Sequence, residues 1–191
     1  MINQNNTPQR CFFQHNDAAL QHKINYSTKP HISAKISPPL GGFLMKCTVR
    51  WAGQDAGMSF VAETASGHAF VMDGAPDAVK PENGGQNLAP RPMETLLAGT
   101  GGCTAYDVVL ILKRGRHDVR GCSVKLSSQR AEVDPKVFTH INMHFTVTGK
   151  GVPALAVERA IAMSHDKYCS ASIMLGKTAE ITTSFEVVEA D

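Results

Sequence analysis

The chain has 191 residues, 42% of them hydrophobic, with 19 Lys and Arg against 17 Asp and Glu and a formal net charge of +2. This length suits one domain with a sizeable core and is short for two. The small, dispersed positive charge argues against a nucleic-acid partner, and no stretch reaches the roughly 20 apolar residues of a membrane span.

Residues 1–44 differ from the rest, because they are rich in Asn, Gln, His, Ser and Pro and have no sustained hydrophobic periodicity. Such a segment buries too little apolar area to offset the entropy of ordering it, so we expect a disordered extension before a folded domain at 45–191. Because Met45 directly precedes the first regular pattern, a native start at that residue is an alternative. The N-terminus lacks a secretory pattern and the five cysteines form no CxxC pair, so we expect a cytoplasmic protein.

Three short strands are expected first. Apolar and polar residues alternate over 46–51, and 58–63 and 68–73 also read as strands, with turns at Ala56-Gly57 and Ser66-Gly67. This spacing predicts an antiparallel meander. In its first strand, Cys47, Val49 and Trp51 alternate with polar residues and should form the buried face.

A loop rich in Pro and Gly covers 74–91, and Pro92 then suits the first position of a helix. Glu94 falls in the first turn, where the helix dipole favours a carboxylate. We expect Gly101-Gly102 to interrupt this helix, so that a second, largely apolar helix runs from Cys103 to Arg114 and stops at Gly115.

Two long strands should follow, the clearer of them over 139–148, where apolar residues occupy the odd positions from Ile141 to Val147. Pro153 opens an amphipathic helix, a short helix is expected over 170–175, and 180–188 alternates again as a last strand. With too few βαβ units for a parallel doubly wound sheet, this order of elements predicts an α+β fold.

Two cysteines lie in settings that suggest chemistry. A reactive thiol needs surroundings that lower its pKa, such as a helix N-terminus or a nearby cation, and Cys103 would have the first if the glycines break the helix. The alternative is that Cys103 is a small residue at a tight helix crossing. Cys169 precedes Ser170, a plausible N-cap, and is either a resolving cysteine or a spacer in a helix corner. Cys47 and Cys122 are interpreted as structural.

Glu94 lies nine residues before Cys103, which on one straight helix puts the two side chains on opposite faces. They converge only if the double glycine bends the chain; otherwise Glu94 is a solvent-facing acid. A metal site at His140 and His144 is not expected, because residues four apart on a strand are about 13 Å apart, too far to share one ion.

Taken together, the segments 91–97, Gly101-Gly102-Cys103 and Tyr168-Cys169-Ser170 resemble the OsmC/Ohr family over Met45 to about Glu189. Within that family the chain is most similar to the YhfA-like branch, on the segments 72–74, 107–109 and 138–142. The resemblance implies an OsmC-like fold, in which antiparallel sheets wrap around long central helices in an intertwined homodimer with a thiol site at each subunit boundary.

The resemblance also implies reduction of organic hydroperoxides in oxidative stress defence, without a cofactor or metal. Cys103 would attack the peroxide and become a sulfenic acid, and Cys169 would condense with it to a disulfide that an external dithiol reduces. Glu94 would orient an arginine beside the thiolate. The chain has no obvious equivalent of the arginine that family peroxidases supply from the N-terminal strands, so the candidates for thiolate tuning are Arg50, Arg91 and Arg114. The expected pocket is lined by Met93, Leu97, Tyr106 and Met174.

Two other interpretations stay open: a non-peroxidatic protein of the same fold that binds a small apolar or thiol-reactive ligand at the subunit boundary, and a structural dimer without a ligand.

Overall fold

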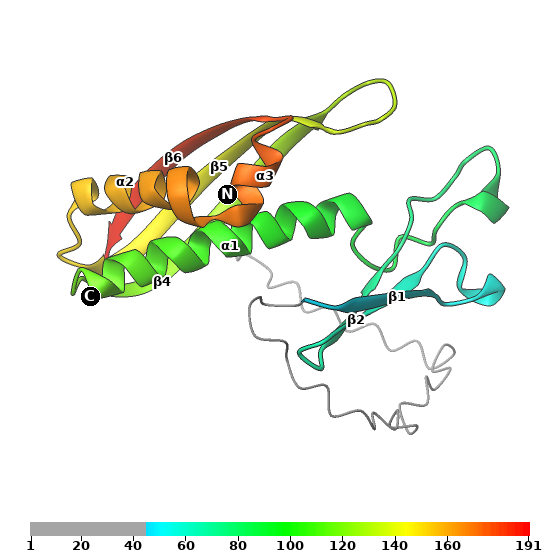
Figure 1. Cartoon of the computed structure of the whole chain (residues 1–191), viewed down its shortest axis with the longest axis horizontal. Coiled ribbons are helices and arrows are strands. Elements are labelled where there is room, and N and C mark those ends of the chain that lie inside the picture. Colours follow the sequence, from blue (N-terminus) through cyan, green and yellow to red (C-terminus); the bar gives the residue numbers. More distant parts are fainter. Residues whose placement is uncertain (1–44) are drawn as a thin grey trace, which may run out of the picture. The chain divides into compact units, whose positions relative to one another are not determined.

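The computed structural model describes residues 45–191, which form the elements labelled in Figure 1. The expected disorder of the first 44 residues lies outside this range. The strands are β1 (Cys47–Trp51), β2 (Phe60–Thr64), β3 (Ala69–Met72), β4 (Asp118–Arg130), β5 (Phe138–Lys150) and β6 (Glu180–Glu189). The helices are α1 (Pro92–Arg114), α2 (Ala154–Met163), a π-helical turn (Ser164–Tyr168), α3 (Ser170–Leu175) and two short 3-10 turns (Gln54–Ala56 and Pro81–Asn83).

β1, β2 and β3 form an antiparallel sheet in sequence order, as the alternation predicts. Arg50 on β1 and Glu63 on β2 are diagonal neighbours in the strand register and form an ion pair with two hydrogen bonds of 2.8 and 2.9 Å. The expected burial of the apolar face of β1 is wrong for the single chain, since Val49 is 53% and Trp51 50% exposed. Strand alternation identifies which side chains share a face, but not what covers them.

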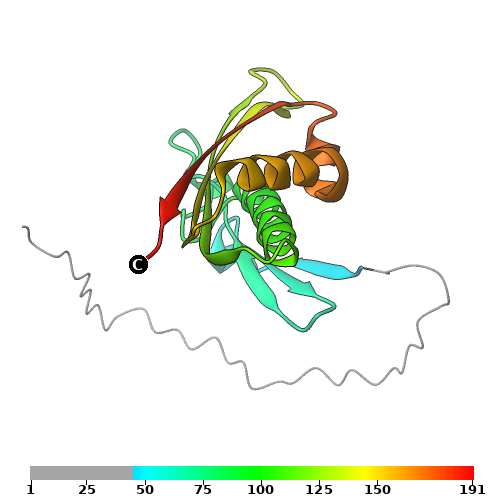
Figure 2. The same cartoon turned by 90° about the vertical axis from the view of Figure 1, so that its left-hand side faces the viewer.

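β4, β5 and β6 form the second sheet of the described region, with β5 in the middle. β4 and β5 are antiparallel, whereas β6 runs parallel to β5 because α2, the π-helical turn and α3 carry the chain back across the sheet. The odd positions of β5 are buried as expected, among them Met143 and Phe145. Both Figures 1 and 2 show α1 and α2 on the same face of this sheet, where Val108 and Val157 complete the core. The α+β architecture is confirmed.

Helix α1 runs unbroken through Gly101 and Gly102, so the expected interruption is wrong. A glycine costs a helix about 1 kcal/mol, which packing against the sheet readily offsets. Gly101 is buried, and a Cβ added to it would lie 2.6 Å from Leu126 Cδ1 on β4. The glycine therefore lets the helix approach the strand closely instead of ending it.

Because it is continuous, α1 is long and apolar enough to pass for a membrane-spanning helix by length and composition, contrary to the expectation from sequence. A core helix of a soluble protein passes the same test, and α1 packs along β4 and α2. Only 28% of the residues in its most apolar window are buried, however. The helix therefore has an apolar face that the single chain leaves uncovered.

Candidate functional site

The structure brings Cys103 and Cys169 together with Asp107. The two sulfurs and a carboxylate oxygen of Asp107 all lie within 4.8 Å of one another. Cys103 and Asp107 come from the middle of α1, one helical turn apart, and Cys169 comes from the junction between the π-helical turn and α3. We call these three residues the thiol cluster.

Cys169 is fully buried and held by the backbone around it. Its N–H donates to Ser164 O at 2.8 Å, and its own carbonyl accepts the Ser172 hydroxyl at 3.0 Å. Cys169, not Ser170, is the N-cap of α3, since its sulfur accepts the Ser172 backbone N–H at 3.4 Å. The expectation that Cys169 meets free backbone amides at this corner is met, with the cap one residue earlier than predicted.

Cys103 is half-buried and lies within α1, so the expected helix N-terminus beside it is wrong. Burial raises the pKa of the Cys103 thiol, and a hydrogen bond with Cys169 and the negative charge of Asp107 raise it further. A hydrogen bond from the Ala171 backbone N–H acts in the opposite direction. The single chain therefore holds Cys103 as a neutral thiol more firmly than water does.

Asp107 was not among the expected site residues. Its Oδ2 accepts a hydrogen bond from the Ser164 hydroxyl at 3.1 Å, which links α1 to the π-helical turn. The signal in the sequence is the spacing Cys-x-x-x-Asp, which places both side chains on one face of a helix, in a segment that is otherwise apolar.

Glu94 and Arg91 lie at the N-terminus of α1, away from the thiol cluster. Glu94 Oε2 accepts the Arg91 backbone N–H at 2.9 Å as part of a capping box. On the unbroken helix, Glu94 is on the opposite face from Cys103 and about 13 Å further along the axis. The bend that would join them within one chain is therefore absent from α1.

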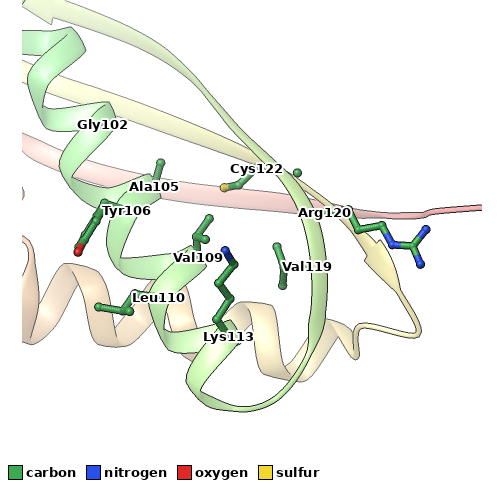
Figure 3. Close-up of a pocket in the computed structure, with 10 residues that line it drawn as sticks. Gly102, Ala105, Tyr106, Val109, Leu110, Lys113, Val119, Arg120 and Cys122 are labelled. Atoms are coloured by element: carbon green, nitrogen blue, oxygen red, sulfur yellow. The ribbon is translucent and has the colours of Figure 1, made fainter.

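The expected pocket is divided in the single chain. Met93 and Leu97 line a cavity of about 390 Å³ together with Arg91 and Glu94. Tyr106 lines a different cavity, of about 550 Å³, between α1 and β4 (Figure 3). Met174 is 67% exposed.

The remaining arginine candidates also separate. Arg50 is engaged by Glu63 on the first sheet. Arg114 lines a cavity of about 230 Å³ that Asp107, Met163 and Tyr168 share. Arg114 is thus the arginine candidate whose cavity reaches a residue of the thiol cluster within one chain.

Comparison with known proteins gives consistent matches. A family model described as OsmC-like protein matches residues 84–184. The chain is 49% identical over 146 residues to Protein YhfA of Escherichia coli (strain K12), which covers 76% of this chain and all of that protein.

Two solved structures share the fold. A hypothetical protein from Aquifex aeolicus VF5 is 25% identical with a TM-score of 0.65, covering 78% of this chain and 100% of that one. An organic hydroperoxide resistance protein OsmC from Legionella pneumophila is 18% identical with a TM-score of 0.56, covering 76% of this chain and 98% of that one.

Proposed function

Because the chain belongs to the OsmC-like family, we propose that it reduces organic hydroperoxides, with Cys103 as the attacking thiol and Cys169 as the resolving thiol. The observation that carries the proposal is the approach of two sulfurs, from distant parts of the sequence, to within 4.8 Å. The name of the Legionella relative, an organic hydroperoxide resistance protein, supports the substrate class.

The reaction needs two thiols and balances without a cofactor. The Cys103 thiolate attacks one peroxide oxygen, the O–O bond breaks, and the alkoxide leaves as an alcohol after taking a proton. The resulting sulfenic acid loses water when the Cys169 sulfur attacks it, which forms a disulfide. An external dithiol then reduces the disulfide by exchange.

The difference in burial supports this division of roles. Cys103 is half-buried and can meet a substrate, whereas Cys169 is fully buried and can be reached only by a sulfur that is already beside it. The Ser172 N–H donates to Cys169 Sγ at 3.4 Å and so helps to hold that sulfur in place for attack on the sulfenic acid.

The proposed active form is a homodimer in the cytoplasm. Glu94 cannot reach Cys103 of its own chain along a straight helix. If Glu94 orients an arginine beside the Cys103 thiolate, that Cys103 therefore belongs to a second subunit. The exposed apolar faces of α1 and β1 are surfaces that a second subunit would cover. An arginine brought from that subunit would offset the burial and the Asp107 charge that disfavour the Cys103 thiolate.

The alternative, a non-peroxidatic protein that binds a small ligand at the subunit boundary, is favoured by one observation. The raised pKa of Cys103 leaves less thiolate at neutral pH than a free thiol has, and the thiolate is the form that attacks peroxide.

Stopped-flow reaction of the reduced protein with cumene hydroperoxide separates the two functions. We expect peroxide consumption by the wild type to be at least about a hundredfold faster than that by a free thiol, and Cys103→Ser to abolish it. Cys169→Ser should retain the first turnover and block disulfide formation. The matched control is Cys122→Ser, a half-buried cysteine outside the thiol cluster, which should react like the wild type. A wild-type rate equal to that of a free thiol would favour the ligand-binding alternative.

A further inference from the structure

The thiol cluster has the composition of a metal site. Its two sulfurs and one carboxylate oxygen, within 4.8 Å of one another, are ligand types that Zn²⁺ takes in proteins. A tetrahedral zinc ion, with bonds of about 2.3 Å to sulfur and about 2.0 Å to oxygen, holds such atoms roughly 3.5–3.8 Å apart. Small side-chain rotations would therefore close the cluster around one ion.

The surroundings of the cluster orient each ligand. The Ser164 hydroxyl donates to Oδ2 of Asp107 at 3.1 Å and so fixes the carboxylate. The backbone N–H groups of Ser172 and Ala171 donate to the sulfurs of Cys169 and Cys103, respectively. Hydrogen bonds of this kind fix ligand geometry and stabilise thiolates at metal centres.

Charge favours a divalent cation at this position. With both thiols ionised, the cluster carries three negative charges within 4.8 Å, which repel one another in a partly buried setting. A zinc ion leaves a net charge of about −1 and satisfies all three ligands at once. A water would complete the four ligands of a tetrahedral zinc site.

We propose that the reduced protein binds one Zn²⁺ per chain through Cys103, Cys169 and Asp107. This site uses the same sulfurs as the proposed redox reaction, so zinc and the disulfide exclude each other. Bound zinc keeps both thiols reduced and keeps hydroperoxide from Cys103. The binding itself does not depend on the protein being a hydroperoxide reductase.

Zinc titration of the reduced full-length chain against a competing chromophoric chelator tests the site. We expect one zinc per chain with submicromolar affinity. Cys103→Ser and Cys169→Ser should each weaken binding at least about tenfold, and Asp107→Asn about 10–100-fold. Cys122→Ser is the control and should bind like the wild type. Equal affinity in the wild type and both cluster cysteine variants would overturn the proposal, as would the absence of submicromolar binding.

A second measurement uses the unsubstituted chain, so it does not depend on how the variants fold. Alkylation of each cysteine is followed by peptide mapping with and without saturating ZnCl₂. We expect zinc to slow the alkylation of Cys103 at least about tenfold and to leave Cys122 unchanged. Unchanged alkylation of Cys103 contradicts the site. Because no peroxide is used, a failure here is distinct from a failure of the proposed reductase activity.

Discussion

At the scale of single residues, burial raises the pKa of the Cys103 thiol most, and Asp107 adds a negative charge that raises this pKa further. Asp107 lies one turn after Cys103 on α1 and brings a negative charge within 4.8 Å of both sulfurs. A neighbouring anion favours the protonated thiol, whereas attack on a peroxide needs the thiolate. Asp107 therefore acts against Cys103 reactivity unless a cation, from a second subunit or a bound metal, offsets it.

Replacing Asp107 with Asn tests whether its negative charge lowers the reactivity of the Cys103 thiol. Removing the charge lowers the pKa of Cys103, so its alkylation should rise at lower pH than in the wild type and be faster at neutral pH. The measurement is the rate of iodoacetamide labelling of Cys103 between pH 6 and about 10, resolved by peptide mapping in metal-free buffer. Cys122, whose pKa is raised by burial alone, is the internal control. A Cys103 profile that is unchanged or displaced to higher pH contradicts the role given to Asp107.

The residues of the cluster differ in how far the sequence predicts them. No local pattern joins Cys103 to Cys169, and their pairing was expected only from the family resemblance. Asp107 is detectable by its spacing from Cys103, although it is not among the expected site residues. Side chains that meet through tertiary structure carry no local signal, which is why their electrostatics could not be predicted.

At the scale of elements, the loop between β3 and α1 sets where α1 begins. The buried carboxylate of Asp73 accepts backbone N–H bonds from Gly74, Gln86 and Leu88 at 2.7–3.0 Å. Its own N–H donates to Pro90 O at 3.1 Å, just before the helix. Asp73 thus holds both ends of the loop and with them the position of Glu94.

Asp73→Asn should lower the melting temperature by roughly 5 °C at pH 7, because an amide has a single oxygen to offer these N–H donors. The backbone hydrogen bonds, led by that from Leu88, lower the pKa of Asp73. Its carboxylate therefore stabilises the fold fully above the ordinary aspartate pKa, and this stabilisation is lost as the pH falls through the lower folded value.

Melting curves of the wild type and Asp73→Asn from pH 7 down to about 3 measure this difference. The gap between the two proteins should be constant near neutrality and shrink at the acid end. A gap that stays constant over the whole range would contradict the role of the charge.

Alternation and periodicity predicted most of these elements, with ends that differ by one or two residues from those observed. The interruption of α1 was the main error, since Gly-Gly is a poor helix sequence by intrinsic propensity. Contact with Leu126 on β4 uses the missing side chain of Gly101 and keeps the helix intact. Propensity describes the isolated segment, and packing outweighed it.

At the scale of the whole molecule, the single chain divides the expected site into two parts. The thiol cluster lies beside the middle of α1, and a cavity at the start of this helix is lined by Arg91, Met93, Glu94 and Leu97. The family resemblance predicts a site at a subunit boundary. The sequence alone could not show whether Glu94 reaches Cys103 within one chain, because that depends on whether α1 bends at Gly101-Gly102. The proposed homodimer unites the two parts across its boundary.

Subunit complementation tests whether Cys103 of one subunit and Glu94 of the other form one site. Cys103→Ser and Glu94→Ala homodimers should each have peroxide reduction lowered at least about tenfold. After the two variants are unfolded and refolded together, half of the dimers are mixed, and each contains one site with both residues intact. Activity should then recover to about a quarter of the wild type. No recovery in a mixture proven to contain mixed dimers would place Cys103 and Glu94 in the same chain's site.

The most direct test of a Cys103–Cys169 redox pair is a single-turnover titration of the reduced, metal-free protein with cumene hydroperoxide, followed by peptide mapping of its disulfides. We predict that one peroxide per chain removes two thiols and yields the Cys103–Cys169 disulfide, with Cys47 and Cys122 remaining free. Peroxide consumption without that disulfide, or disulfide formation no faster than in a free dithiol, would contradict it.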